Sequence, residues 1–430
     1  MRSRREKMKR IQTFDLLRGF AILAVVIFHR VFFDYYAQHG DAQGLSLGFF
    51  IFGLFSSMAG IFFCISGAVN TYVNFNRLKE GKQTSTQFLL RSIVTGLTLS
   101  VIGLLFRYFL LRSYDDVVSV NAAGEVLSYN ETGVLPYMIL YGVYPSKFNI
   151  LIMFQTGTIQ MIGYSIVAVS LLLVLYQKFR GLDDPGPVRR AFLILGIAIF
   201  LISGLTYQFL WGPAQQAAAN ENFLGILVLT PLVFGTFPIF PHLSFGFFGA
   251  YFGVAFAQKD ADPEKVLGAL FRFWIILFVL GVILLAITTA MELFGTWYFA
   301  WGRKLTQLGI YFFLLWLGMK FIDYQPEGTR EGRMKSLNWL VTIGRGTLTV
   351  FILEGVVAVS LQRLIAPLWP AWNASVVNAA LFGFINLVVW MMIITIWKRV
   401  EFVGSVEWLY AWLVRSLSGE KTSKMDALQT

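Results

Sequence analysis

Two ionisable side chains lie inside strongly apolar stretches, where burying a charge is costly. His29 closes the run TFDLLRGFAILAVVIFHR (13–30), and Glu354 lies in IGRGTLTVFILEG (343–355). An imidazole titrates near neutral pH, so it can accept a proton from a hydroxyl or an amine, or hold an acyl group briefly. Because ionisable groups at membrane depth are functional by default, the pattern predicts a general base at His29. A helix-packing histidine, hydrogen-bonded to a neighbouring span, is the structural alternative.

Glu354 is predicted to reach a depth similar to that of His29. It follows about seventeen residues after the start of its apolar stretch, roughly 25 Å along a helix, whereas His29 lies roughly 21 Å beyond Asp15. A carboxylate there could orient the imidazole or accept its proton. A structural hydrogen bond to Ser, Thr or Arg of another helix explains it equally well. The pairing of the two side chains is a hypothesis, because a single sequence does not show which helices touch.

The other histidines do not form a metal-binding pattern. Besides His29, the sequence holds only His39 and His242, with no His-x₃-His or Glu-x-x-His pair, and Cys64 is the single cysteine. Zinc sites need several clustered ligands, so we predict neither a metal nor a disulfide. His242 stands at the head of a later apolar run and is expected to shape the outer mouth of the bundle.

The elements that must hold these residues are membrane-spanning helices. The chain is 57% hydrophobic and 14% charged, whereas soluble domains carry about 25% charged residues. Apolar runs of about twenty residues recur along it, and each can cross a hydrocarbon core of about 30 Å. We therefore predict an all-α polytopic membrane protein with about ten transmembrane helices. The predicted spans are 14–36, 46–75, 87–111, 148–176, 190–211, 241–258, 266–290, 305–322, 337–362 and 375–397.

Charge predicts the orientation of these spans. Six of the first ten residues are Lys or Arg, and basic segments stay on the cytoplasmic side. With ten spans, the N- and C-termini are both expected in the cytoplasm, which suits a protein of the cell (plasma or inner) membrane. Basic residues exceed acidic ones by eleven, which in a membrane protein is a topology signal rather than a sign of nucleic-acid binding. The first apolar run has full span length and no small-residue cleavage site, so no cleavable signal peptide is expected.

Three segments are not plain spans or loops. Residues 112–147 are polar and mildly acidic, and are predicted to lie outside. Residues 212–240 contain an apolar piece broken by Pro and Gly, which indicates a re-entrant or interfacial segment. After the last span, 402–417 has Trp, Leu and Val on one side of a helix with Lys and Arg around it, as in an interfacial amphipathic helix. We therefore expect one transmembrane domain over 1–400 and a cytoplasmic amphipathic tail over 401–430.

Several motifs resemble one family in the same order along the chain. Asp-x-x-Arg-Gly, an aliphatic run and a His fourteen residues after the Asp resemble the first helix of the integral-membrane acyltransferase superfamily. That group includes bacterial polysaccharide O-acetyltransferases and heparan-α-glucosaminide N-acetyltransferase-like proteins. FFCISGAV (62–69) resembles its Ser-Gly box, and IGRGTLTVFILEG is similar to its Gly-Arg-x-x-Leu-Thr helix. The tail VGSVEWLYAWLVRSL resembles the closing box of an uncharacterised branch, with Ser405 in place of Pro.

The resemblance implies a membrane acyltransferase. Such an enzyme would move an acyl group, expected to be acetyl, from cytoplasmic acyl-CoA (acetyl-CoA) to an extracytoplasmic glycan or lipid-linked sugar. His29 would then be the catalytic base and Glu354 its partner. His39 lies near the position of a loop histidine in the heparan-type members and is the runner-up base, although an ordinary solvated loop residue is the simpler interpretation.

Basic side chains supply candidates for the donor and acceptor sites. Asp15 and Arg18 lie three residues apart on the first turn, where they either meet the donor or form a local salt bridge. Arg91 heads a span at the cytoplasmic edge, and Arg345 is predicted about 12 Å inside its span; both could hold CoA phosphates. Arg107, at the outer end of the third span, could steady a glycan or an oxyanion, and snorkelling to headgroups explains it equally well. His242 is the second acceptor-side candidate.

Two other classes of function stay open. Broken spans and intramembrane charges also suit a transporter or permease of a small molecule or lipid-linked substrate. Residues 1–215 and 216–430 show no similarity of the kind that pseudo-symmetric transporter halves would have. A non-catalytic protein that binds or senses a lipid or glycan is the third option, and a homodimer is compatible with the sequence.

Overall fold

A computed structural model describes residues 10–36, 53–55, 57–112, 116–120, 126–130, 132–144, 154–258, 261–291, 293 and 297–418. The first half of the chain holds α1 (Gln12–His29), the π-helical η1 (Arg30–Tyr36), η2 (Ser57–Gly60), α4 (Ile61–Lys79), α5 (Ser85–Phe109), α6 (Val134–Tyr141), α8 (Thr158–Arg180) and α9 (Pro185–Ala219). The second half holds α10 (Phe223–Val233), α11 (Ile239–Ala257), α12 (Pro263–Ala290), α13 (Trp297–Gly318), the π-helical η3 (Met319–Asp323), α14 (Glu327–Arg345), α15 (Thr347–Ile365), α16 (Val376–Arg399) and α17 (Val406–Leu417).

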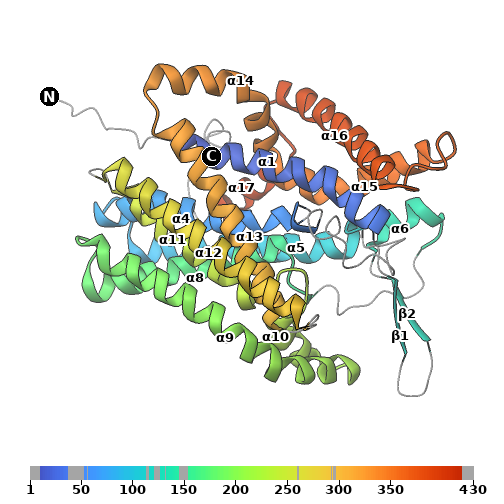
Figure 1. Cartoon of the computed structure of the whole chain (residues 1–430), viewed down its shortest axis with the longest axis horizontal. Helices are drawn as coiled ribbons and strands as arrows, with labels where there is room; N and C mark the ends of the chain where they lie inside the picture. Colours follow the sequence, from blue (N-terminus) through green and yellow to red (C-terminus); the bar gives the residue numbers. More distant parts are fainter. Residues whose placement is uncertain are drawn as a thin grey trace.

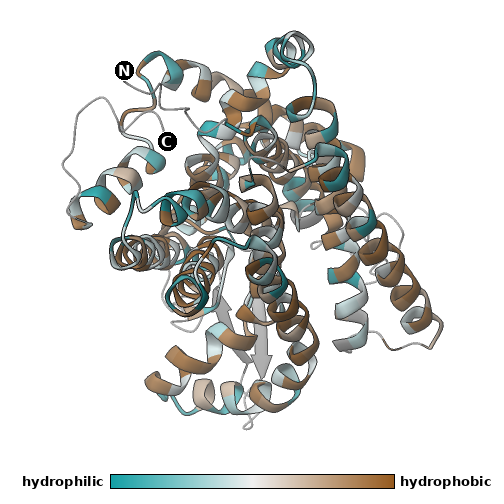
Figure 2. Ribbon diagram, turned by 90° about the vertical axis from the view of Figure 1, so that its left-hand side faces the viewer, coloured by the Kyte–Doolittle hydropathy of each residue, from teal (hydrophilic) through white to brown (hydrophobic). Residues whose placement is uncertain are grey.

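The predicted helical membrane protein is confirmed. Within the described ranges, ten helical segments are long and apolar enough to cross a membrane. Apolar side chains cover the outside of the bundle as well as its interior, and Figure 2 shows brown ribbon on its outer helices. Leu280 and Ile283 of α12, for example, are 52% and 50% exposed. A helix that is apolar on every side must be buried, and since these side chains are not covered by the described part of the protein, they are expected to face lipid.

The bundle has two ends, which we call the near face and the far face. α1 begins where α13 ends, because Thr13 packs directly against Gly318. This end is the near face, on the left of Figure 1, and the opposite end is the far face. α4 and α11 both start at the far face and run side by side.

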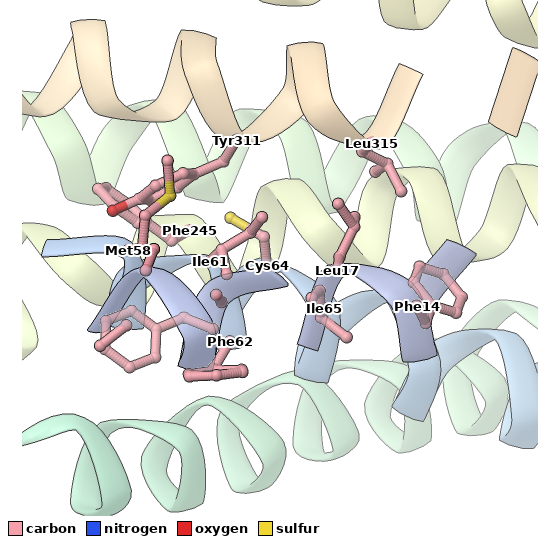
Figure 3. Packing of buried hydrophobic residues seen from close by; sticks show 14 of the residues in the cluster. Phe14, Leu17, Met58, Ile61, Phe62, Cys64, Ile65, Phe245, Tyr311 and Leu315 are labelled. Atoms are coloured by element: carbon pink, nitrogen blue, oxygen red, sulfur yellow. The ribbon is translucent and has the colours of Figure 1, made fainter. Parts of the chain in front are cut away.

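The centre of the bundle forms around α1, α4, α11 and α13. A Cβ atom on Gly249 would lie 2.0 Å from the carbonyl oxygen of Cys64, and one on Gly67 would lie 2.0 Å from that of Gly246. These glycines let the backbones of α4 and α11 touch, so Gly67 of the Ser66-Gly67 motif serves helix packing. Figure 3 shows part of the core around this contact, with Cys64 and Ile65 of α4, Phe245 of α11, and Tyr311 and Leu315 of α13 among its side chains.

The predicted continuous span over 337–362 is wrong. The chain breaks at Gly346, which separates α14 from α15, and the candidate span is Thr347–Ile365. α14 instead packs along the start of α1, where a Cβ on Gly344 would lie 2.5 Å from the carbonyl oxygen of Asp15. The apolar residues on both sides of Gly346 hide this break, because hydropathy does not register a change in helix direction.

The segments 112–147 and 212–240 contain structure that hydropathy did not predict. Residues 116–130 include an antiparallel hairpin of β1 (Asp116–Val120) and β2 (Val126–Asn130). The apolar part of 212–240 folds as α10, an 11-residue helix that is too short to span. Parts of the predicted spans 46–75 and 148–176, namely 46–52, 56 and 148–153, lie outside the described residues.

Candidate active site

His29 and Glu354 lie together in the far half of the bundle. His29 is the last residue of α1, and its Nδ1 is 3.8 Å from Oε2 of Glu354 on α15. The carboxyl side chain is 7% exposed and the imidazole 20% exposed. The two helices therefore meet as the sequence hypothesis required, with a buried carboxylate behind a histidine that still has an open side.

A buried chain of alternating charges holds this carboxylate in place. Nη2 of Arg30 is 3.0 Å from Oε1 of Glu354, and Nη1 of the same side chain is 3.2 Å from Asp34. Asp34 in turn is 3.0 Å from Nη2 of Arg112. Arg30, Asp34 and Arg112 are each at most 4% exposed at the side chain. Alternating guanidinium and carboxylate groups compensate one another, which buried charges require.

Four helices contribute to this network. Arg30 and Asp34 are four residues apart in η1 and therefore face the same side. Arg112 follows the end of α5. Its Nη2 also donates to Oε1 of Gln362 at 2.7 Å, about two turns beyond Glu354 on α15. From α16, Nδ2 of Asn386 lies 3.5 Å from Oε1 of Glu354. The site is thus built where the far ends of α1, α5, α15 and α16 meet.

Sequence reasoning did not assign Arg30, Asp34 or Arg112 to the site. The opposite charges at 30 and 34 in an apolar run were a usable signal, because such a pair shares a helix face. The sequence around Arg112 gave no such signal, because this residue belongs to the predicted outer segment 112–147. Only tertiary packing brings it to Asp34, 78 residues away in the chain.

The near-face candidates form a separate group around the start of α1. Oδ1 of Asp15 lies 3.7 Å from Nη1 of Arg18, and Oδ2 lies 2.8 Å from Nε of Arg10. The local salt bridge considered for this pair is therefore present. The helix end itself is fixed by Asp323 of η3, which accepts hydrogen bonds from the backbone of residues 12 and 13 at 2.9 Å each. That cap was not predicted.

The predicted depth of Arg345 is wrong. It is the last residue of α14, is exposed, and precedes the span that begins at Thr347. The neighbouring Gly344 packs against α1 between Asp15 and Gly19. Arg345 therefore lies at the level of the near-face group, where a cation remains accessible to a soluble phosphate.

Arg91 lies beside the C-terminal helix. Burial raises the pKa of Tyr410 on α17 to about 12, while a hydrogen bond from Thr95 and the positive charge of Arg91 act in the opposite direction. α17 thus packs on α5 at the position of Arg91. Glu407 of the same helix accepts hydrogen bonds from the backbone N–H groups of Leu348 and Thr349, at 2.5 and 3.1 Å.

Two of the outer candidates are buried, and one lies outside the described residues. Arg107 is 5% exposed; its Nη1 is 3.4 Å from Oε1 of Gln155, and its guanidinium packs against Gly157 at the start of α8. Snorkelling does not account for a side chain so enclosed. His242 is 1% exposed, so it does not line an open mouth. His39, the runner-up base, is in the undescribed segment 37–52.

Comparison with known protein families identifies the fold. A profile described as an acyltransferase domain matches residues 11–398. The chain belongs to this acyltransferase family. The match covers the helices that carry His29, Glu354 and both buried arginines, and it stops before α17. No curated protein matches the chain significantly.

Two small apolar recesses, both closed to anything larger than a water molecule in this structure, lie between the near face and His29. One is bounded by α14, α1, α15 and α16 and reaches Val26, one turn before His29. The other starts at Trp397 and Phe402. Both are lined by Val350, Trp390 and Ile394. Nε1 of Trp390 is buried there without a hydrogen-bond partner.

Within the described part of the chain, no group of three His, Cys, Asp or Glu side chains is placed to hold a metal ion. The chemistry available at the site is that of an imidazole, a carboxylate and two guanidinium groups. Such a set can accept a proton at the histidine and stabilise the resulting imidazolium through Glu354. The guanidinium groups keep the carboxylate buried and charged without a metal.

Proposed function

We propose that this acyltransferase moves an acyl group, expected to be acetyl, from cytoplasmic acyl-CoA to an extracytoplasmic sugar or lipid-linked glycan. The observation that carries the proposal is the contact between His29 Nδ1 and Glu354 at 3.8 Å, next to the ion pair between Glu354 and Arg30. A base that is deep in the membrane and still 20% exposed suits an acceptor arriving from the far face. The protein would act in the cell (plasma or inner) membrane, with the near face in the cytoplasm.

In the proposed reaction, His29 is the general base. Nδ1 faces Glu354, so Nε2 would take the proton of the acceptor hydroxyl or amine. The acceptor oxygen or nitrogen then forms a bond to the thioester carbonyl carbon, and the carbon–sulfur bond to CoA breaks. The proton on the imidazole passes to the departing thiolate, which leaves as free CoA. Glu354 stabilises the imidazolium between these two steps.

The donor would bind at the near face. Exposed Arg345 and the nearby pair Asp15 and Arg18 give this region cations at the level where the nucleotide of CoA would remain in the cytoplasm. Arg91 is the fourth donor-side candidate. The apolar recesses between α1, α15 and α16 are closed in this structure, so a pantetheine arm would enter there only after these helices separate; Nε1 of Trp390 could then donate to one of its carbonyl oxygens.

Binding of acetyl-CoA to the detergent-purified chain tests the donor half of the proposal. We expect micromolar binding by calorimetry, with at least a threefold weaker Kd in Arg345→Ala or Arg91→Ala. Arg272→Ala, which removes an exposed arginine of α12, is the matched control and should bind as the wild type does. If no acyl-CoA binds to the folded protein, the donor assignment is wrong.

The residues 401–430 are proposed to be a distinct cytoplasmic tail outside the transmembrane domain of 1–400. The family profile ends at residue 398, which supports this division. The described part of the tail nevertheless packs closely on the bundle through Glu407 and Tyr410.

A further inference from the structure

A second buried polar cluster lies at the far face, outside the network of Arg30 and Glu354. His242 near the start of α11 is 1% exposed, and Lys304 on α13 is 9% exposed. Nδ1 of His242 lies 2.8 Å from the carbonyl oxygen of Pro238. Its Nε2 is buried and has no hydrogen-bond partner. The imidazole is thus held on one side, and its other nitrogen meets no hydrogen-bond partner among the described residues, so it can bind a polar group of a ligand.

His242 and Lys304 lie close together, because both side chains contact the same aromatic ring. Phe237 is shared: the Nζ of Lys304 lies 5.6 Å from its ring centroid, and the ring of His242 lies 5.1 Å from it. Phe63 and Phe245 enclose the other sides of the imidazole, at 6.1 and 5.3 Å between centroids. Phe245 is visible in Figure 3 beside Tyr311. The hydroxyl of Tyr311 donates to the carbonyl of residue 57, so its proton is not available for a hydrogen bond to a ligand.

The described residues do not balance the charge of Lys304. In the network around Arg30, each guanidinium has a carboxylate at 3.0–3.2 Å. Among the residues that the structure describes, none places a carboxylate within ion-pair distance of Lys304. The cation–π contact with Phe237 offsets only part of the cost of removing an ammonium from water. Gln307, three residues along α13 and 2% exposed, adds an amide to this buried stretch.

We propose that His242 and Lys304 form a binding site for an anionic group, a phosphate or a carboxylate, of a ligand that enters from the far face. The ammonium supplies the charge. Nδ1–H of His242 donates to the carbonyl of Pro238, so Nε2 donates to the bound anion in the imidazolium form, and the rings exclude water. The inference depends on the proposed function in one respect only: it takes the acyl acceptor to be the molecule that carries the phosphate or carboxylate. A prenyl phosphate and an acidic sugar share the required chemistry.

The test measures binding to the full-length protein in neutral detergent with two pairs of probes. Farnesyl phosphate is compared with farnesol, and glucuronate with glucose, by thermal shift and calorimetry. We expect the anionic member of one pair to raise Tm and its neutral partner to do so much less. The first pair identifies a lipid phosphate, and the second a sugar carboxylate.

Variants then assign the binding to the cluster. Lys304→Met should weaken the anionic probe at least tenfold, and Lys304→Arg should retain most of the affinity. Lys265→Met, which removes an 85% exposed lysine, should change nothing. Because Lys304→Met deletes an uncompensated buried charge, the unliganded variant should be at least as stable as the wild type.

Two outcomes would overturn the site. One is that neither anionic probe binds better than its neutral partner. The other is that Lys304→Met and His242→Gln, both folded, bind the probe as the wild type does. Acetyl-CoA is titrated in parallel: a chain that binds the anionic probe but no acyl-CoA would keep this site and lose the proposed function.

Discussion

The carboxylate of Glu354 contacts both a histidine and an arginine, and these two contacts determine the expected effect of substituting Glu354. Its Oε1 lies 3.0 Å from Arg30, and its Oε2 lies 3.8 Å from His29. Glu354→Gln keeps the size of the side chain but removes the charge that stabilises an imidazolium. We expect acyl transfer to fall by about 10²–10⁴-fold, the usual contribution of general acid–base catalysis. Acetyl-CoA binding, measured by calorimetry, should stay within threefold; a variant that keeps full transfer would exclude this role for Glu354.

The pair of Asp34 and Arg112 is expected to serve stability. Asp34→Leu leaves two buried guanidinium groups without this shared carboxylate, and breaking such a pair costs about 3–5 kcal/mol. The double variant Asp34→Leu/Arg112→Leu removes both charges and should recover part of the loss. Thermal unfolding in detergent compares the two, and a double variant less stable than Asp34→Leu would contradict this reading of the pair.

The sequence could identify those site residues that stand out within their own segment, but not those that join the site through contacts between distant helices. His29 and Glu354 were found because each is an ionisable group deep in a strongly apolar run. Their contact, and the participation of Arg112, depend on helices far apart in the chain and could not be read from residue spacing. The depth of Arg345 was misjudged because a helix break at Gly346 leaves no trace in hydropathy.

At the scale of elements, α15 depends on α17. Glu407 accepts hydrogen bonds from the first free N–H groups of α15, so it acts as a helix cap supplied by the tail, and Thr349 also donates its hydroxyl to it. Since α15 carries Glu354 two turns further on, the docked tail fixes the start of the helix that bears the candidate partner of His29. The sequence predicted an amphipathic tail helix but gave no sign of this cap.

Loss of this cap should destabilise the protein moderately. Glu407→Ala removes the acceptor of these hydrogen bonds, and helix caps contribute about 0.5–2 kcal/mol. Tm should therefore fall, with the membrane bundle still assembled. Glu401→Ala, at an exposed position in the turn before α17, is the control and should leave Tm unchanged. Equal Tm values for the two variants would show that the cap does not matter.

The same carboxyl group predicts a dependence of stability on pH. Burial raises the pKa of Glu407 above its ordinary value, although hydrogen bonds from Thr349 and Leu348 act in the opposite direction. A raised pKa in the folded state means that its contribution is full below the ordinary glutamate pKa and is lost as pH rises through the folded pKa. Tm of the wild type should decline across that window. Glu407→Gln should lack this part of the decline, and parallel curves for both would contradict the assignment.

At the scale of the whole molecule, hydropathy was sufficient for the helical membrane class and for ten spans, because each long apolar run must be buried in lipid. Hydropathy was insufficient where the path of the backbone changes without a change in composition. The hairpin of 116–130 and the separation of α14 from α15 are the two cases. The orientation of the bundle follows from its charges alone and is therefore a prediction.

Cysteine labelling in intact cells tests that orientation. The native Cys64 is buried and should stay silent. A membrane-impermeant maleimide should react with Gly142→Cys at the far face, and with Lys82→Cys at the near face only after the cells are opened. The opposite pattern would place the near face outside and would make cytoplasmic acyl-CoA unable to reach Arg345.

The most direct test of the central claim is transfer of radiolabelled acetyl from acetyl-CoA in proteoliposomes, with a glycan and lipid-linked sugar extract of the native membrane inside or outside the vesicles. The wild type should label an acceptor on the far-face side and release one CoA per acetyl group. His29→Ala should bind acetyl-CoA normally and label nothing. Undiminished labelling by His29→Ala would show that the base lies elsewhere and would contradict the assignment of the pair His29 and Glu354.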